Sequence, residues 1–160
     1  MTKLLVLSDS HGGRAAIERV LMKESKSIDA LIFLGDGLRD LELALTQYPK
    51  LRAYSVAGNC DYGALEPTDG LAAFDGVVIF YTHGHMYGAK YDLDTLADAA
   101  SARGAEVALF GHTHRRELVR GVGTAATVFN PGSLRDGGSY GVVTITNGEC
   151  SFTWKRVPEF

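Results

Sequence analysis

The apolar positions of this chain gather in short unbroken runs, each followed by a small turn. The runs Leu4–Leu7, Ala30–Leu34 and Val107–Phe110 contain no polar residue. Runs of this length without alternation predict strands buried on both faces, which is typical of sheets covered by helices. Arg52–Ala57 is predicted as a further strand, and the whole pattern indicates an α/β fold.

Stretches with apolar residues on one helical face lie between these strands. The first is predicted as a helix from about Arg14 to Lys23. The second begins near Leu38 and stops before Pro49, and the third spans Leu93–Arg103, with Asp92 as its cap.

The rest of the pattern predicts strands joined by tight turns. Asp75-Gly76 separates the apolar runs Leu71–Phe74 and Val77–Tyr81, and this dipeptide between such runs is a strong hairpin signal. After Phe110 the pattern is β only, and we expect antiparallel strands joined by glycine-rich turns, with the loop 130–133 interrupting them. These strands are Glu117–Arg120, Ala125–Phe129, Tyr140–Thr146 and Cys150–Lys155. Strand–helix units followed by a β meander suggest two packed sheets with helices outside.

Composition narrows the function classes only a little. A length of 160 residues predicts one domain over residues 1–160, and a net charge of -3 argues against a stable nucleic-acid partner. Leu4–Leu7 is too short for the apolar region of a signal peptide, and no stretch reaches transmembrane length. Two cysteines without CxxC spacing suggest neither disulfides nor a cysteine-rich zinc site. We therefore expect a cytoplasmic protein without a membrane partner, with a homodimer left open.

Candidate chemistry lies where the predicted strands end. All five histidines follow a strand: His11, His83, His85, His112 and His114. In an extended chain residues i and i+2 point the same way, so we expect His112 and His114 to present two imidazoles to one point. A lone histidine is more often structural, but imidazole is also the commonest ligand for transition metals.

Three further polar residues, Asp9, Asp36 and Asn59, follow strands in the same way. Asp9 and Ser10 on their own would be read as caps of the following helix, and Asp36 and Asn59 as turn residues. The glycines around Asp36 would also let backbone approach a shared carboxylate closely. Together with the histidines these residues form a set without thiolate, which suits Mn²⁺, Fe, Zn²⁺ or Ni²⁺. The candidates are too many for one tetrahedral ion and suit two ions that share a carboxylate.

The order of these motifs resembles the calcineurin-like metallophosphoesterase superfamily. The resemblance rests on Asp9-x-His11, Gly35-Asp36, Gly58-Asn59, His83 and Gly111-His112-x-His114. Four stretches resemble more closely its small single-domain bacterial and archaeal phosphodiesterases: Asp9-Ser10-His11-Gly12, Gly58-Asn59-Cys60-Asp61, Thr82-His83-Gly84-His85 and Asn130-Pro131-Gly132-Ser133.

The resemblance implies a four-layer α-β-β-α sandwich of two mixed β-sheets flanked by helices. It also implies a metal-dependent phosphoesterase, acting on phosphate diesters through in-line attack by a hydroxide that bridges two divalent ions about 3.5–4 Å apart. Mn²⁺ is the expected metal, with Fe, Ni²⁺ or Zn²⁺ as alternatives. The implied ligands are Asp9, His11, Asp36 and His114 for one ion, and Asp36, Asn59, His83 and His112 for the other, so that Asp36 bridges.

One position departs from most of the superfamily. Cys60 stands where a histidine often follows the asparagine, and we interpret it as inert packing. Protonation of the leaving group would then fall to His85 or to solvent, with a structural role for His85 as the alternative. Tyr62, Tyr87 and Tyr91 are expected at the rim of an open cleft.

Two other functions remain open from the sequence. The same fold resembles a retromer subunit that acts as a protein-binding scaffold, and two-metal sites also serve peptidases. All seven ligand positions here carry residues that can bind metal. A non-catalytic scaffold would not need to retain these residues.

Overall fold

The computed structural model describes residues 1–159 and contains two five-stranded sheets and three α-helices. In chain order the elements are β1 (Thr2–Leu7), α1 (Arg14–Glu24), β2 (Ala30–Phe33), α2 (Leu38–Leu45), β3 (Ala53–Ser55), β4 (Asp69–Phe74), β5 (Val77–Thr82), the 3₁₀ turn η1 (His85–Tyr87), α3 (Asp94–Ala102), β6 (Val107–Leu109), β7 (Arg116–Val119), β8 (Thr127–Pro131), β9 (Ser139–Thr146) and β10 (Glu149–Arg156).

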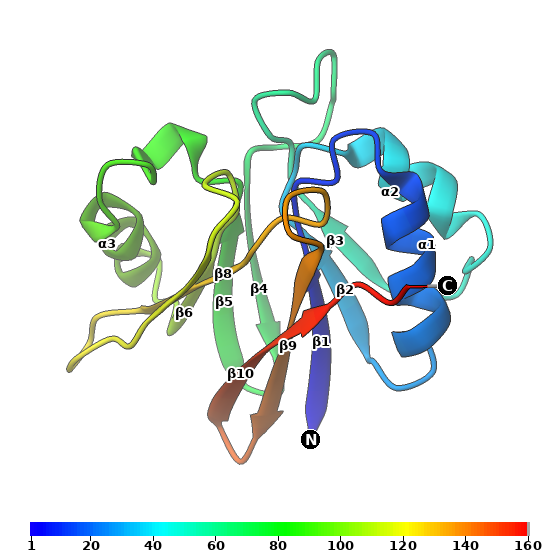
Figure 1. Cartoon of the computed structure of the whole chain (residues 1–160). Coiled ribbons are helices and arrows are strands. Elements are labelled where there is room, and N and C mark those ends of the chain that lie inside the picture. The colour runs from blue at the N-terminus through cyan, green and yellow to red at the C-terminus, as the bar shows by residue number, and fades with distance from the viewer. Residues whose placement is uncertain (160) are drawn as a thin grey trace.

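The molecule has the four layers that the family resemblance implies. The two sheets pack face to face, with α1 and α2 on the outer face of one and α3 on the outer face of the other (Figure 1). Buried side chains such as Ile32 and Leu109 fill the space between the sheets. Leu5 and Leu31 point the other way, into the layer under α1 and α2, whereas Phe80 packs under α3. Strands that are apolar at every position therefore serve two cores at once.

Both sheets are mixed, as expected. One has the order β10-β9-β1-β2-β3, in which β1, β2 and β3 are parallel and β9 and β10 are antiparallel additions. The other has the order β4-β5-β6-β8-β7, in which β5, β6 and β8 are parallel. The carboxyl ends of parallel strands share an edge of their sheet, and the loops that leave them form the site described below.

The last four strands do not form the single meander that their pattern predicts. β7 and β8 belong to one sheet and β9 and β10 to the other, and β8 runs parallel to β6. The turn expected at 130–133 is strand over its first half, because Asn130 and Pro131 still pair with β7. The reason is that a local sequence pattern predicts that a segment is a strand but does not determine which strand it pairs with.

The hairpin turn predicted at Asp75-Gly76 is present, and Asn147-Gly148 forms a second one. Asp75-Gly76 joins β4 to β5, and Asn147-Gly148 joins β9 to β10, with positive φ at all four residues. This backbone matches the twist of the strands that the turns connect. Within residues 1–159, no helix has the length and apolar character needed to cross a bilayer.

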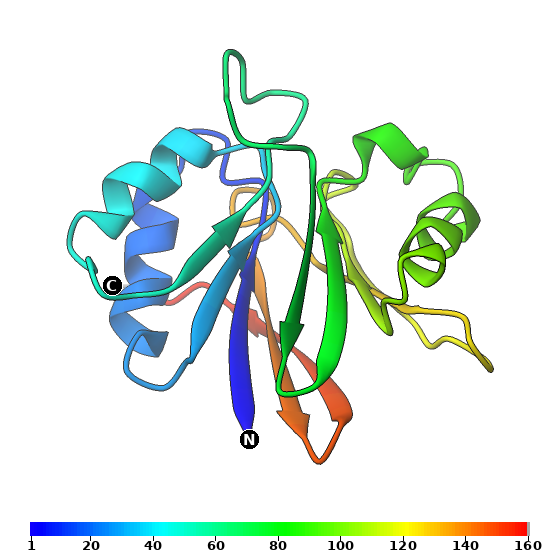
Figure 2. The same cartoon turned by 180° about the vertical axis from the view of Figure 1, so that it is seen from behind.

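The two sheets are tied together at the edge where the parallel strands end. The loop after β8 reaches across to the loop after β1: the Leu134 amide donates to the Ser8 carbonyl at 3.0 Å, and Ser133 Oγ donates to the Asp9 carbonyl at 2.8 Å. Figure 2 shows from behind how loops of both sheets gather at this edge, with the segment between β3 and β4 rising above them. Residues from both halves of the chain therefore meet here.

Candidate metal centre

Unusual backbone geometry marks the site before its side chains are considered. Seven non-glycine residues of the described chain have positive φ, and two of them are the hairpin residues Asp75 and Asn147. The other five are all predicted ligands: Asp9, His11, Asp36, His112 and His114. Left-handed backbone costs free energy in such residues and concentrates at functional sites. It also means that His112 and His114 are not in extended backbone, so the geometry on which their expected convergence rested is absent.

Asp9 is the most enclosed residue of the site, with its side chain fully buried. Its Oδ2 accepts hydrogen bonds from Ser8 Oγ at 2.5 Å and from the His112 amide at 3.0 Å. Its Oδ1 faces His83 Nε2 at 3.0 Å and His114 Nε2 at 3.4 Å. Oδ2 therefore links the loops through hydrogen bonds, and Oδ1 faces the imidazoles. The expectation that Asp9 and Ser10 cap α1 is wrong, because the helix begins after Gly13 without a side-chain cap.

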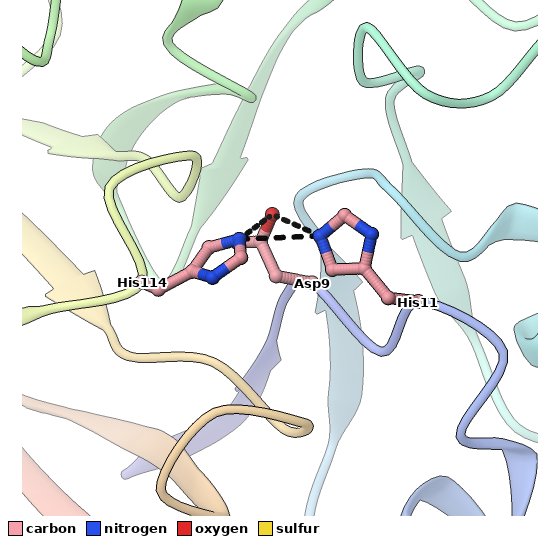
Figure 3. Close-up of side chains that lie close together, drawn as sticks. All are labelled: Asp9, His11 and His114. Atoms are coloured by element: carbon pink, nitrogen blue, oxygen red, sulfur yellow. Dashed lines mark hydrogen bonds and ion pairs between the residues drawn. The ribbon is translucent and has the colours of Figure 1, made fainter.

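Asp9, His11 and His114 form a first donor group (Figure 3). The two Nε2 atoms of the histidines lie 3.1 Å apart, and His11 Nε2 lies 3.6 Å from Asp9 Oδ1. Ligands held about 2.1 Å from a tetrahedral ion lie about 3.4 Å from one another. One carboxylate and two imidazoles at this spacing fit a divalent transition metal.

Asp36 forms the neighbouring part of the site and is likewise buried. Its Oδ2 lies 3.2 Å from His83 Nε2 and 3.6 Å from His11 Nε2, and its Oδ1 accepts the Cys60 amide at 2.8 Å. Asp9, Asp36 and His83 form a second donor group that overlaps the first. Asp36 therefore faces histidines of both groups, as a bridging carboxylate must.

The remaining predicted residues lie around His83. The His112 and His83 rings lie 4.9 Å apart between centroids, and His85 Nδ1 lies 3.0 Å from His83 Nδ1. Asn59 is exposed, and its amide nitrogen lies 3.7 Å from Cys60 Sγ. Five of the predicted ligands therefore lie in the two donor groups, whereas His112 packs beside His83 and Asn59 lies at the margin.

Close backbone approach around Asp36 requires glycine, as predicted. A Cβ on Gly35 would lie 2.6 Å from the Gly58 nitrogen, and one on Gly58 would strike the Asp36 carboxylate. The loops after β2 and β3 therefore interlock only because these side chains are absent.

Comparisons with known proteins agree with this geometry. A family model described as the calcineurin-like phosphoesterase superfamily domain matches residues 2–148. The probable metallophosphoesterase YsnB of Bacillus subtilis is 33% identical over 152 residues, covering 90% of this chain and 85% of the relative. The chain belongs to the calcineurin-like phosphoesterase superfamily.

Solved structures share the fold of this phosphoesterase-family chain. A predicted phosphoesterase from Streptococcus pneumoniae superposes with a TM-score of 0.82 at 25% identity, covering 96% of this chain and 88% of the other. Two more distant structures show the fold alone. A novel archaeal phosphodiesterase has a TM-score of 0.70 at 19% identity, with 96% and 100% coverage, and the zinc complex of Vps29 from Entamoeba histolytica has a TM-score of 0.75 at 20% identity, with 98% coverage of both chains.

In this superfamily member, Asp61 supports the site without facing it. Its two carboxylate oxygens accept four backbone amides at 2.7–3.0 Å: those of Asp36, Gly37, Leu38 and Gly58. This carboxylate caps the start of α2 from another loop and fixes the backbone of Asp36. In the sequence Asp61 stands out only as part of the motif Gly58-Asn59-Cys60-Asp61, and no local pattern indicates this role.

Contacts behind the loops after β6 and β8 also hold the site, and they join residues that are distant in the sequence. Asp136 Oδ2 lies 2.6 Å from His114 Nδ1, so it accepts that proton and leaves Nε2 as the ligand atom. The buried Asn130 donates to the Gly111 carbonyl and to Thr113 Oγ1, both at 3.0 Å. The motif 130–133 was the only sequence signal for these contacts, and nothing in the pattern singles out Asp136.

The aromatic residues predicted at the cleft rim behave differently from one another. Tyr62 and Tyr91 are 90% and 91% exposed, and Tyr62 lines a surface groove together with Cys60. The Tyr87 hydroxyl donates to Asp69, so this residue anchors η1 to β4 instead. A groove of about 480 Å³ opens beside His11, and Arg39 is among its lining residues.

The histidines of the site differ in the direction in which their pKa values are shifted. Burial alone would raise the pKa of Asp9, but hydrogen bonds from His114 and His83 hold it well below its ordinary value. Burial disfavours protonated His83, yet Asp36 and Asp9 raise its pKa to about 9, and contact with Asp9 raises that of His114 to about 9. Burial, followed by the positive charge of His83, lowers the pKa of His112 to about 4.

These shifts predict that metal binding depends on pH. With pKa values of about 9, His83 and His114 hold protons at neutral pH, and a metal ion must displace both. We expect about two protons to be released per loaded site, and metal affinity to rise as pH increases towards 9, by about tenfold per pH unit for each proton displaced. Calorimetric titration in buffers of different ionisation enthalpy counts the protons. An affinity that does not change with pH would contradict the assignment.

Proposed function

We propose that this protein is a binuclear metal-dependent phosphodiesterase. The observation that carries the proposal is the pair of overlapping donor groups, in which Asp9 and Asp36 face histidines from loops of both sheets. This donor set combines carboxylate and imidazole, which suits Mn²⁺, Fe, Ni²⁺ or Zn²⁺. The membership of the superfamily supports hydrolysis of phosphate esters.

The proposed ligands follow the motif order, and the donor groups that support the assignment contain five of them: Asp9, His11, Asp36, His83 and His114. One ion is assigned to Asp9, His11, Asp36 and His114, and the other to Asp36, Asn59, His83 and His112. The assignment requires the oxygen of the Asn59 side-chain amide to reach the second ion, while its nitrogen keeps the contact with Cys60 Sγ. It also requires Asp36 Oδ2, which already faces both groups, to be shared.

When bound, two divalent ions would supply an activated water for in-line attack on phosphorus and would neutralise charge on the phosphoryl oxygens. The chain's own residues set the surroundings. Asp9 and Asp36 carry two negative charges, so two ions leave the site with about two positive charges, which attract a phosphate ester. The groove beside His11 and Asp36 gives the ester open access.

His85 is the proposed group for contact with the leaving group. Its Nδ1 lies against His83, and burial, followed by the charge of His83, lowers its pKa. A neutral imidazole at pH 7 is a weak acid for protonating an alcohol. We therefore propose that diesters with good leaving groups are hydrolysed fastest.

The competing function is a protein-binding scaffold. The likeness to Vps29 structures shows that this fold is not restricted to proteins named as phosphoesterases. The free-energy cost of the site argues against a purely structural role. Five ligand residues have left-handed backbone, and two carboxylates are buried. A chain without catalytic use for these residues gains nothing from that cost.

The deciding experiment is hydrolysis of bis-p-nitrophenyl phosphate by metal-stripped protein, with Mn²⁺, Fe²⁺, Ni²⁺ or Zn²⁺ added back. We expect metal-dependent turnover that disappears in Asp36→Ala and persists in Asp98→Ala, which removes an exposed carboxylate on α3. The monoester p-nitrophenyl phosphate tests the preference for diesters. No turnover with any of the four ions, despite metal bound to the protein, would favour the scaffold.

The proposal also covers the cellular location, the activating metal, the number of domains and the oligomeric state. Cys60 and Cys150 are both free thiols, which suits a cytoplasmic protein. We propose Mn²⁺ as the activating ion, a single domain over residues 1–160, and a homodimer to be tested by light scattering.

A further inference from the structure

Cys60 lies at the open edge of the metal centre. The expectation that it is inert packing is wrong, because the residue is exposed. Its sulfur belongs to a third donor group, with His11 and Asp36, whose ligand atoms all lie within 4.8 Å of one another. His11 and Asp36 are both assigned to the first ion, so the thiol stands beside that ion's position.

Two contacts hold the sulfur in this place. The Cys60 amide donates to Asp36 Oδ1 at 2.8 Å, which fixes the backbone of residue 60 next to the bridging carboxylate. The Asn59 amide nitrogen faces Cys60 Sγ at 3.7 Å. An N–H directed at sulfur stabilises a thiolate ligand, as contacts behind metal ligands commonly do.

We propose that the Cys60 thiolate is a further ligand of the ion held by His11 and Asp36. The inference rests on the metal centre of the proposed function and adds a ligand to it. On binding, the thiol releases its proton to solvent and a sulfur lone pair forms the bond to the metal. No oxidant or reductant is required.

The consequence is a preference among metals. Carboxylate and imidazole donors accept Mn²⁺, whereas thiolate favours softer ions such as Zn²⁺, Co²⁺ and Cd²⁺. A thiolate also adds a third negative charge beside Asp9 and Asp36, which reduces the attraction of the loaded site for a phosphate ester. The site should therefore hold thiophilic ions more tightly than Mn²⁺, without needing them for turnover.

Cobalt provides a readout that is independent of activity. Co²⁺ bound to thiolate gives a near-ultraviolet charge-transfer band, and its visible d–d bands report occupancy without reference to sulfur. We expect metal-stripped wild type loaded with Co²⁺ to show both. Cys60→Ser should keep the d–d bands and lose the charge-transfer band. Cys150→Ser is the matched control, since this half-buried cysteine on β10 packs against the core between the sheets, and it should retain both.

Competition between Zn²⁺ and Mn²⁺ gives a second measurement on the same three proteins. The preference for Zn²⁺ should fall by about tenfold or more in Cys60→Ser and stay unchanged in Cys150→Ser. Wild type with d–d bands and no charge-transfer band would overturn the proposal, as would a band that survives in Cys60→Ser. Failure to hydrolyse diesters, with the charge-transfer band present, would instead reject the proposed function and leave Cys60 as a ligand.

Discussion

Replacing Asp9 by asparagine is expected to abolish metal-dependent hydrolysis and to destabilise the metal-stripped protein by about 1–2 kcal/mol at neutral pH. The buried Asp9 carboxylate lies 3.0 Å from His83 Nε2 and contributes to raising the pKa of His83 from 6.5 to about 9. The whole shift corresponds to about 3 kcal/mol of stabilisation of the protonated histidine, and it is shared between Asp36, which contributes first, and Asp9. Asparagine has the same shape but cannot supply the charge.

The pH dependence of this effect follows from the sign of the shift. A raised histidine pKa stabilises the fold in full below pH 6.5, and the stabilisation is lost as pH rises through about 9. The free energies of unfolding of metal-stripped wild type and Asp9→Asn, measured with urea, should therefore differ most at the low-pH end of this window. They should become equal at high pH. Equal stabilities at pH 6.5 would show that the pair contributes nothing.

A matched control for Asp9 lies at the opposite end of the same sheet. Asp29 Oδ2 accepts the Lys3 amide at 2.8 Å, so Asp29→Asn also alters an aspartate that accepts a backbone N–H. Because Asp29 precedes β2 rather than following a strand, this variant should keep wild-type turnover and metal affinity.

Replacing Asp61 by alanine is expected to reduce the free energy of unfolding by about 3 kcal/mol, because amides without an acceptor cost about 1–3 kcal/mol each and water can reach some of them here. Four backbone amides lose the same acceptor, among them those of Asp36 and Gly58. The metal affinity should fall by about 10–100-fold, since Asp36 is no longer held in place. Asp61→Asn, which keeps one acceptor oxygen, should lie between alanine and wild type.

Comparing Asp92→Ala with Asp61→Ala distinguishes the loss of a helix cap from the loss of support for Asp36. Asp92 Oδ1 accepts a single amide, from Asp94 at the start of α3. Asp92→Ala should cost about 1 kcal/mol or less and leave metal affinity unchanged. If Asp61→Ala behaved in the same way, Asp61 would be an ordinary helix cap and not a support for Asp36.

Much of the fold was predictable because its signals are local. The hairpin at Asp75-Gly76 and the strand Leu4–Leu7 are encoded in adjacent residues, and both are present. Interpreting Asp9 and Ser10 as helix caps failed for the same reason: a cap and a ligand look alike in sequence. Ser10 Oγ instead donates to Asp40 Oδ2 at 2.6 Å, a contact that crosses thirty positions of the chain.

The sequence by itself determined the order of strands and helices and the chemistry at the strand ends, because apolar periodicity and residue type are properties of neighbouring positions. Only the tertiary structure decided which strands share a sheet, and so that β8 runs parallel to β6. It alone decided that His112 and His114 turn to different partners, through left-handed backbone held by contacts with Asp9 and Asp136. These contacts join residues far apart in the chain, and local pattern carries no information about such pairs.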